Sequence, residues 1–370
     1  MTEEIKVASW NSLTKSFEFL TTSPDGYSVK KQLKIMTQIL CFSSLFIMGT
    51  QATAGIQMAV SLTWNGKELK KTNLETLEKV RQQFPKVPFI HFISPDYYSA
   101  DYDDSTNNVT ESIKNLIHPI DSVGLKMHGS QHITELANVR PLMSPTFWGE
   151  KNCKAECMRS VPLDAWSEKE IQKMIAASSN QLEQEGYNIG PWFISSGWLA
   201  TPKVLSAARA EGFRYDFSAV PPSLLQEQLA HYPLLGWLQQ LWASKTVFSQ
   251  PQRLPTSNGW VQEMGQNMAS MDYLSMTKIL KTFQSYTNLQ KMTPEKDYFL
   301  HLGMNVETAL HTAPKFSATL KRMIKIAQSE KVGFKFYQPP GSRSKKVQKA
   351  SSNHISRQHD FDRHPPHSRY

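Results

Sequence analysis

Two histidines four residues apart, His128 and His132, give the clearest chemical signal in this sequence of 370 residues. Residues at positions i and i+4 lie on one face of a helical turn, so both imidazoles could bind a single metal ion. The alternative is a pair of ordinary polar histidines at a helix surface or cap. The pair directly follows an apolar run, residues 122–127, that is typical of a strand. This position favours the metal-site interpretation.

Three further polar residues, Asn65, His91 and His301, stand near or just after the end of other strand-like runs. In a (β/α) barrel, catalytic side chains gather at the carboxyl ends of the strands. We therefore expect these residues and the histidine pair to meet at one end of the fold. For His91 the alternative, a hydrogen-bonded histidine on a mostly apolar strand, is favoured.

The elements that must position these residues alternate along the chain. Apolar runs predict strands at residues 56–64, 87–93, 122–127, 189–194, 213–218, 298–302 and 333–337. Helical spacing of apolar residues predicts helices at residues 74–84, 110–117, 167–184, 202–211, 271–286 and 314–331. Strands that alternate with helices favour an α/β fold with a parallel sheet or barrel. We assign one catalytic domain to residues 55–338.

The chain before that domain has the features of an export signal. Lys30, Lys31 and Lys34 precede the apolar run 39–48, and Ala52-Thr53-Ala54 follows as an A-x-A cleavage site. The run is shorter than the roughly 20 residues that span a bilayer, and its alternative is a buried core helix. We expect residues 1–54 to be an extension plus signal peptide that is removed. The mature protein would then be periplasmic or secreted, without a stable membrane anchor.

Two of the three cysteines remain in the mature chain, since Cys41 lies within the apolar run. Cys153 and Cys157 are close in sequence, and in an oxidising compartment a disulfide is the natural interpretation. The alternative is half of a zinc site, but no second Cys or His pair with suitable spacing lies nearby.

The net charge of +9 is concentrated at the C-terminus. Residues 341–370 hold seven basic and two acidic side chains, so the folded body is only mildly basic. We interpret residues 339–370 as a solvated, disordered, low-complexity tail. Binding of an anionic polymer is the alternative, and no nucleic-acid-binding module is evident.

Six short segments together resemble one branch of the NodB-type polysaccharide deacetylases. They are Val60-Ser-Leu-Thr-Trp-Asn-Gly66, Pro88-Phe-Ile-His-Phe-Ile-Ser-Pro95, Val123-Gly-Leu-Lys-Met-His-Gly129, Phe193-Ile-Ser-Ser-Gly-Trp198, Gly212-Phe-Arg-Tyr-Asp-Phe-Ser218 and Phe299-Leu-His301. They follow the family's order over residues 56–337. The resemblance implies a distorted (β/α) barrel and the hydrolysis of an N-acetyl group on a cell-wall glycan, with peptidoglycan N-acetylglucosamine as the expected substrate and partner.

The resemblance also implies roles for individual residues. His128 and His132 match the family's metal ligands, and His301 matches its general acid. Asn65 occupies the position of a catalytic or metal-binding aspartate. Trp198 and Asp216 match the walls of the substrate groove, and Trp64 and His91 are further candidates for substrate contact. The implied cofactor is a divalent metal, with zinc the first expectation, which lowers the pKa of a bound water.

Two departures from the family pattern bear on catalysis. Asn65 replaces an aspartate, and an amide cannot accept a proton as a carboxylate can. Ile194 replaces an arginine that braces this base. A carboxylate from the loop holding Asp96, Asp101, Asp103 and Asp104 could substitute. The alternatives are a catalytically impaired glycan-binding pseudoenzyme and another amide or ester hydrolase. A serine hydrolase is not expected, because no G-x-S-x-G elbow is present.

Overall fold

The computed structural model describes residues 54–99, 108–150 and 155–339. The strands in these ranges are β1 (Ile56–Trp64), β2 (Ile90–Ile93), β3 (Ser122–Met127), β4 (Ile189–Ser195), β5 (Tyr215–Asp216), β6 (Gln252–Thr256), β7 (Gly259–Glu263), β8 (Tyr298–Asn305) and β9 (Phe334–Phe336). The α-helices are α3 (Lys71–Gln83), α4 (Val109–Lys114), α5 (Gln131–Leu136), α6 (Glu168–Gln184), α7 (Pro202–Ala210), α8 (Pro222–Leu229), α9 (Pro233–Leu241), α10 (Met276–Met292) and α11 (Ala309–Ser329).

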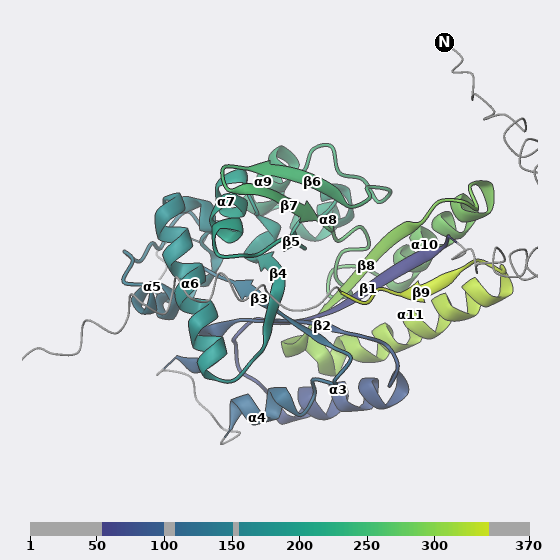
Figure 1. The fold of residues 1–370 in the computed structure, drawn as a ribbon, viewed down its shortest axis with the longest axis horizontal. Helices are drawn as coiled ribbons and strands as arrows, with labels where there is room; N and C mark the ends of the chain where they lie inside the picture. The colour runs from purple at the N-terminus through teal and green to yellow at the C-terminus, as the bar shows by residue number, and fades with distance from the viewer. Residues whose placement is uncertain (1–53, 100–107, 151–154, 340–370) are drawn as a thin grey trace, which may run out of the picture. The chain divides into compact units, whose positions relative to one another are not determined.

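The strands form one curled sheet in the order β6-β7-β5-β4-β3-β2-β1-β8, with β9 paired to the start of β1. All pairs are parallel except the β6–β7 hairpin, which is antiparallel. The carboxyl ends of β1, β3, β4 and β8 therefore lie at one edge (Figure 1). This is the end of a (β/α) barrel at which catalytic side chains gather.

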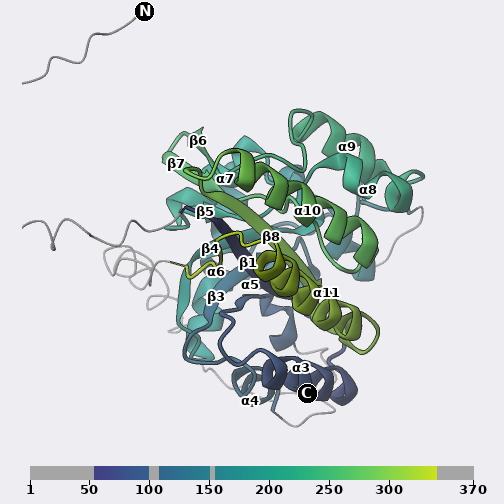
Figure 2. The same cartoon turned by 90° about the vertical axis from the view of Figure 1, so that its right-hand side faces the viewer.

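Both faces of the sheet are buried, which explains the long apolar runs of its strands. One face forms a small interior cluster that includes Ala59, Phe92, Ile194 and Phe217. The other face packs against the helices in a much larger core. In Figure 1, α3 and α11 lie side by side beneath β1 and β2, and Figure 2 shows α10 and α11 along β8.

The barrel is incomplete, because β8 has no strand partner on its outer edge within the described part of the chain. Residues 266–271 lie along this edge, and the Ser270–Gly303 bridge adds one ladder contact. The Asn267 side-chain amide forms the hydrogen bonds to β8 that the backbone of a neighbouring strand would form. Its Nδ2 donates to the Phe299 carbonyl at 2.8 Å, and its Oδ1 accepts from the His301 N–H at 2.9 Å. These bonds satisfy backbone groups that an open edge would leave unpaired.

The predicted α/β class and distorted barrel are confirmed. β1 and β3 occupy the predicted residues, and a capping box formed by Ser167 and Glu170 begins α6 close to its predicted start. The sequence reasoning missed the β6–β7 hairpin and helices α8 and α9. It also began the last long helix at Pro314, whereas α11 begins at Ala309.

Several predictions lie outside the described residues. These are the signal peptide before Ala54, the tail beyond Pro339, and the Cys153 half of the expected disulfide, so all three stay predictions. In the part of the chain that the structure describes, no helix is long and apolar enough to cross a membrane.

Candidate active site

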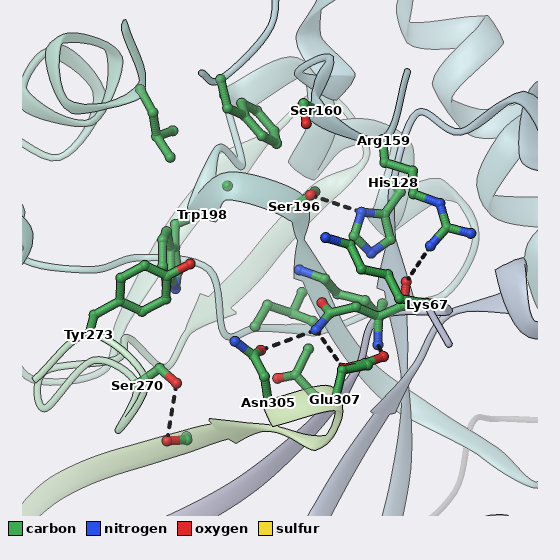
Figure 3. A pocket seen from close by; sticks show the side chains of 18 of the residues that line it. Lys67, His128, Arg159, Ser160, Ser196, Trp198, Ser270, Tyr273, Asn305 and Glu307 are labelled. Carbon is green, nitrogen blue, oxygen red and sulfur yellow. Dashed lines mark hydrogen bonds between the residues drawn. The ribbon is translucent and has the colours of Figure 1, made fainter. Parts of the chain in front are cut away.

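A cavity of about 310 Å³ opens at the carboxyl edge of the sheet (Figure 3). Its lining comes from the ends of four strands, from two loops that fold over them and from Leu234 of α9. The polar lining residues are Thr63, Asn65, Lys67, Lys126, His128, Arg159, Ser160, Ser196, Gln266, Ser270, Asn305, Glu307 and Thr308. Phe147, Trp148, Trp198, Leu234 and Tyr273 supply most of the apolar lining. An apolar wall with a few convergent polar groups is the usual composition of a small-molecule site.

The centre of the polar side is a contact between His128 and Ser196. The Met127–Ser195 register of the β3–β4 pair places the two following residues beside each other. Ser196 Oγ lies 3.0 Å from His128 Nδ1, and both side chains are buried. The opposite ring nitrogen, Nε2, is buried without a hydrogen-bond partner in the described structure. A buried polar atom of this kind is uncommon and indicates a functional position.

Positive charge surrounds His128. Burial is the main cause that lowers its pKa well below the usual range, and Lys126, Arg159 and Lys67 lower it further. The backbone of Arg159 opposes this shift by favouring the protonated ring. The ring is therefore neutral near pH 7, with an electron pair available on one nitrogen.

Lys126 is the most deeply buried of these cations. Burial lowers its pKa to about 7, against the opposing effect of Glu307. Its Nζ lies 3.4 Å from the Ser195 carbonyl, directly before Ser196. A charge in this position can stabilise negative charge that develops on a ligand in the cavity.

The carboxylate beside Asn65 is Glu307, which is not one of the aspartates expected from sequence to substitute for the missing base. Glu307 follows β8, and its Oε2 accepts from Asn65 Nδ2 at 3.0 Å. Its Oε1 accepts from the Asn65 N–H and from the Tyr97 hydroxyl, both at 2.6 Å. Asn65 Nδ2 also donates to Asn305 Oδ1 at 3.2 Å. Asn65 thus orients a carboxylate instead of supplying one.

An arginine is also present near Asn65, although Ile194 takes the family's arginine position. Arg159 Nη1 donates to the Asn65 carbonyl at 3.3 Å, and its Nε lies 3.5 Å from Asp96 Oδ2. Asp96 is fully buried and packs against Gly66, the residue after Asn65. Position 66 requires glycine, because a Cβ there would lie 2.3 Å from the Asp96 Cβ. Asp96 does not line the cavity, and Asp101, Asp103 and Asp104 lie outside the described residues.

Aromatic side chains form the opposite wall. Trp198 and Tyr273 meet edge to face, with ring centroids 5.1 Å apart and an interplanar angle of 74°. Trp198 Nε1 donates to Gln266 Oε1 at 3.0 Å, which fixes the indole. Figure 3 shows this pair across the cavity from His128 and Arg159. Trp198, a substrate contact expected from the resemblance, lies in the cavity lining.

His132 does not join His128. It lies on α5, half-buried, and its Nε2 is 2.9 Å from Gln181 Oε1 on α6. It is not among the residues that line the cavity. The two imidazoles expected to share a cation are thus engaged with different partners.

The donor set does not fit a divalent metal. Among the described residues, no three His, Cys, Asp or Glu side chains lie together in a way that could hold a metal ion. Asn65 uses its amide nitrogen to contact Glu307 and Asn305. Lys126 and Arg159 would also repel a cation beside His128. The metal remains a prediction from the family resemblance that these residues do not support.

His301 lies deeper in the barrel than the cavity. It shares a strand face with Gly303 and Asn305, which line the cavity, but is further from the carboxyl end. Its ring contacts Ser61 Oγ at 2.8 Å and the Gly265 carbonyl at 3.2 Å. Burial lowers its pKa to about 3. The structure does not bring this expected general acid to the cavity.

Three other predicted contacts are core residues. Trp64 Nε1 donates to His91 Nδ1 at 3.1 Å, and His91 Nε2 lies 3.2 Å from Asp121 Oδ2. His91 is thus a hydrogen-bonded histidine on a mostly apolar strand, which is the alternative that the sequence favoured. Asp216 is fully buried, and its Oδ1 accepts from the Ser218 N–H and hydroxyl. None of the three lines the cavity.

Sequence reasoning missed Ser196, Arg159 and Glu307 as site residues. Ser196 had an available signal, because it lies two residues after a predicted strand and directly before Gly197. Arg159 and Glu307 had none, since each reaches Asn65 over a sequence separation of 94 residues or more.

Comparisons with known proteins place the fold in context. No family model and no curated protein sequence matches the chain. A family 4 carbohydrate esterase from Streptomyces lividans is 9% identical over 73% of this chain and 90% of its own, with a TM-score of 0.36. A probable polysaccharide deacetylase from Pseudomonas aeruginosa PAO1 is 13% identical over 84% and 93%, with a TM-score of 0.45. Puue allantoinase is 10% identical over 82% and 93%, with a TM-score of 0.44.

The first two structures are named as a carbohydrate esterase and a probable polysaccharide deacetylase. At this level of identity and TM-score they do not define an activity for this chain. We therefore infer its function from the cavity residues.

Proposed function

We propose that this chain is a deacetylase-type hydrolase that removes acetyl groups from a glycan. One observation carries the proposal: the cavity sets an aromatic wall, Trp198 and Tyr273, across from His128 (Figure 3), and Lys126 also lines it. Aromatic faces suit the apolar faces of sugar rings. Neutral imidazole can move a proton, and a buried ammonium can stabilise an oxyanion, which are the two needs of acyl hydrolysis.

The proposed substrate is an N-acetylated cell-wall glycan, with peptidoglycan N-acetylglucosamine as the first candidate. The signal-like segment before Ala54 supports this choice, because an exported hydrolase would meet the cell wall. The sequence motifs shared with polysaccharide deacetylases support the same substrate class.

The test is acetate release from an N-acetylglucosamine trisaccharide and from purified peptidoglycan. We expect release by the full chain and a loss on the order of 100-fold or more in His128→Ala. The matched control is His311→Ala, which changes an exposed histidine outside the cavity. Equal release by the His128→Ala variant would overturn the proposal.

A second candidate, a glycan-binding protein without turnover, is favoured by the absence of convergent metal ligands among the described residues. It predicts trisaccharide binding with no acetate release from any acetylated sugar. Trp198→Ala should weaken binding under both candidates, by about 10-fold for a lost stacking contact. Trp260→Ala, at an exposed site on the β7 hairpin, should leave it unchanged.

A further inference from the structure

The cavity contains a hydroxyl and an imidazole in the arrangement of a nucleophile and its base. Ser196 Oγ lies 3.0 Å from His128 Nδ1, which is within the range for proton transfer. Both residues line the cavity and stand at the ends of adjacent parallel strands. Their backbones are therefore held by the sheet, which favours a fixed geometry over a surface contact.

The neighbouring serine shows that the Ser196 hydroxyl is not needed for the local turn. Ser195 Oγ donates to the Leu199 carbonyl at 3.0 Å, and the Ser195 N–H donates to Ser218 Oγ at 2.8 Å. These bonds fix the turn after β4. The only hydrogen bond of the Ser196 hydroxyl in the described structure is to His128.

The turn itself exposes Ser196 at the cavity. Gly197 has φ of 60°, a conformation that favours glycine. A Cβ there would lie 2.7 Å from the Phe147 ring, which closes over the turn. A residue in the left-handed conformation therefore follows Ser196 directly, and this position has no room for a side chain. The G-x-S-x-G pattern is absent because Ile194 and Trp198 occupy its two glycine positions.

We propose that Ser196 is the nucleophile of the acetyl transfer and that His128 is its general base. This inference rests on the proposed function, since the substrate must carry an acetyl group. Ser196 Oγ forms a bond to the acetyl carbonyl carbon while its proton passes to His128 Nδ1. The carbonyl oxygen becomes an oxyanion beside the Lys126 ammonium.

Collapse of this intermediate breaks the bond between the acetyl carbon and the sugar nitrogen. The leaving amine takes the proton from His128 Nδ1 and departs, which leaves an acetyl ester on Ser196. Water then attacks the ester while His128 accepts its proton, and acetate is released. The proton returns to Ser196 Oγ, so the pair is regenerated and no other reactant is consumed.

The experiment traps the acetyl-serine in the full chain. The protein is mixed with p-nitrophenyl acetate, quenched in acid and analysed by intact mass and peptide mapping. We expect a burst of nitrophenol and one acetyl group on Ser196. Ser196→Ala and His128→Ala should each lose the adduct, whereas Ser223→Ala, at an exposed position outside the cavity lining, should keep it. Thermal unfolding checks that each variant is folded.

Acetate release from the trisaccharide, measured on the same variants, separates this inference from the proposed function. Release that persists in Ser196→Ala, with no adduct on the wild-type serine, would overturn the nucleophile and leave the deacetylase intact. No release by any variant, with an adduct on Ser196, would overturn the glycan substrate and leave the nucleophile. Ser196→Cys should form a longer-lived acetyl thioester. If this variant is folded and forms no thioester, that result would also count against the inference.

Discussion

Glu307 Oε2 accepts a hydrogen bond from Asn65 Nδ2 at 3.0 Å, so the amide at the end of β1 orients a carboxylate that follows β8. In the resembling family an aspartate occupies the first of these positions. Here the carboxylate has another origin, and the amide is its donor. The cavity therefore contains a carboxylate beside position 65, although the aspartate of the family pattern is absent there.

Replacement of Asn65 by aspartate should reduce activity and stability. A carboxylate in place of this amide cannot donate to Glu307 or Asn305, and it would set two carboxylates in contact. We expect a loss of about 2 kcal/mol in the free energy of unfolding, typical of broken hydrogen bonds to a charged group. Acetate release should fall by about 10-fold or more, because Glu307, whose charge favours the protonated form of Lys126, loses its orientation. Urea unfolding measures the change in the free energy of unfolding, and the acetate assay measures the change in activity.

Asn188→Asp is the matched control for this change, because Asn188 is exposed and does not line the cavity. A steep increase in acetate release on Asn65→Asp would show instead that the site lacks a carboxylate and has degenerated from the family pattern.

Removal of metal ions should leave activity unchanged. His132 is bonded to Gln181, and Lys126 and Arg159 lower the affinity of the His128 surroundings for a cation. We expect full acetate release after dialysis against a chelator, and near-normal release by His132→Ala. Activity that is lost on chelation and restored by zinc would contradict this charge argument and support the ligand pair expected from sequence.

The dependence of activity on pH should favour the acidic side of neutrality. His128 has a pKa well below its usual range, so it stays neutral and able to accept a proton as the pH falls from about 8 to about 6. Lys126 has a pKa of about 7, so its charge is lost as the pH rises above that value. Activity should therefore fall in mildly alkaline buffer. Rates measured across this range test both directions.

Lys126→Met separates the two groups. This variant should be slower throughout and should lose the alkaline decline, since no ammonium remains to titrate. An alkaline decline of the same midpoint in Lys126→Met would assign it to another residue.

Asp216 should make the protein less stable as the pH rises. Burial raises its pKa to about 7, and nearby Glu263 adds to the effect. The folded state thus keeps a proton that the unfolded chain releases near pH 4. Its contribution is fully present below about pH 4 and is lost as the pH approaches about 7, a change on the order of 4 kcal/mol.

Asp216→Asn should remove this dependence and be the more stable protein at pH 7, because an amide can still accept from Ser218. Asp164→Asn, at an exposed site, should follow the wild-type profile. Parallel stability curves for wild type and Asp216→Asn would show that this carboxyl is not buried as described.

The sequence was informative where local patterns decide structure. Apolar runs located the barrel strands, placement at strand ends identified Asn65 and His128 as cavity residues, and the motif resemblance identified Trp198. Such arguments identify which end of the barrel a residue occupies. They do not identify how deep a side chain lies: His301 and Asp216 were expected at the substrate site, whereas in the structure both are buried in the core and neither lines the cavity.

Contacts between distant segments could not be derived in this way. The His128–His132 spacing was compatible with convergence, but tertiary packing pairs one ring with Ser196 and the other with Gln181. Likewise Glu307 and Arg159 reach Asn65 only because the sheet brings β8 beside β1 and the segment after residue 154 folds over the cavity. The spacing of residues along the chain does not predict these pairings.

The most direct test of the account is acetate release from the N-acetylglucosamine trisaccharide by the full chain, with His128→Ala and His311→Ala assayed beside it. The account predicts release by the wild-type protein and the His311 variant, and a loss on the order of 100-fold or more in the His128 variant. Equal rates for all three proteins, or binding of the trisaccharide without any acetate, would contradict it.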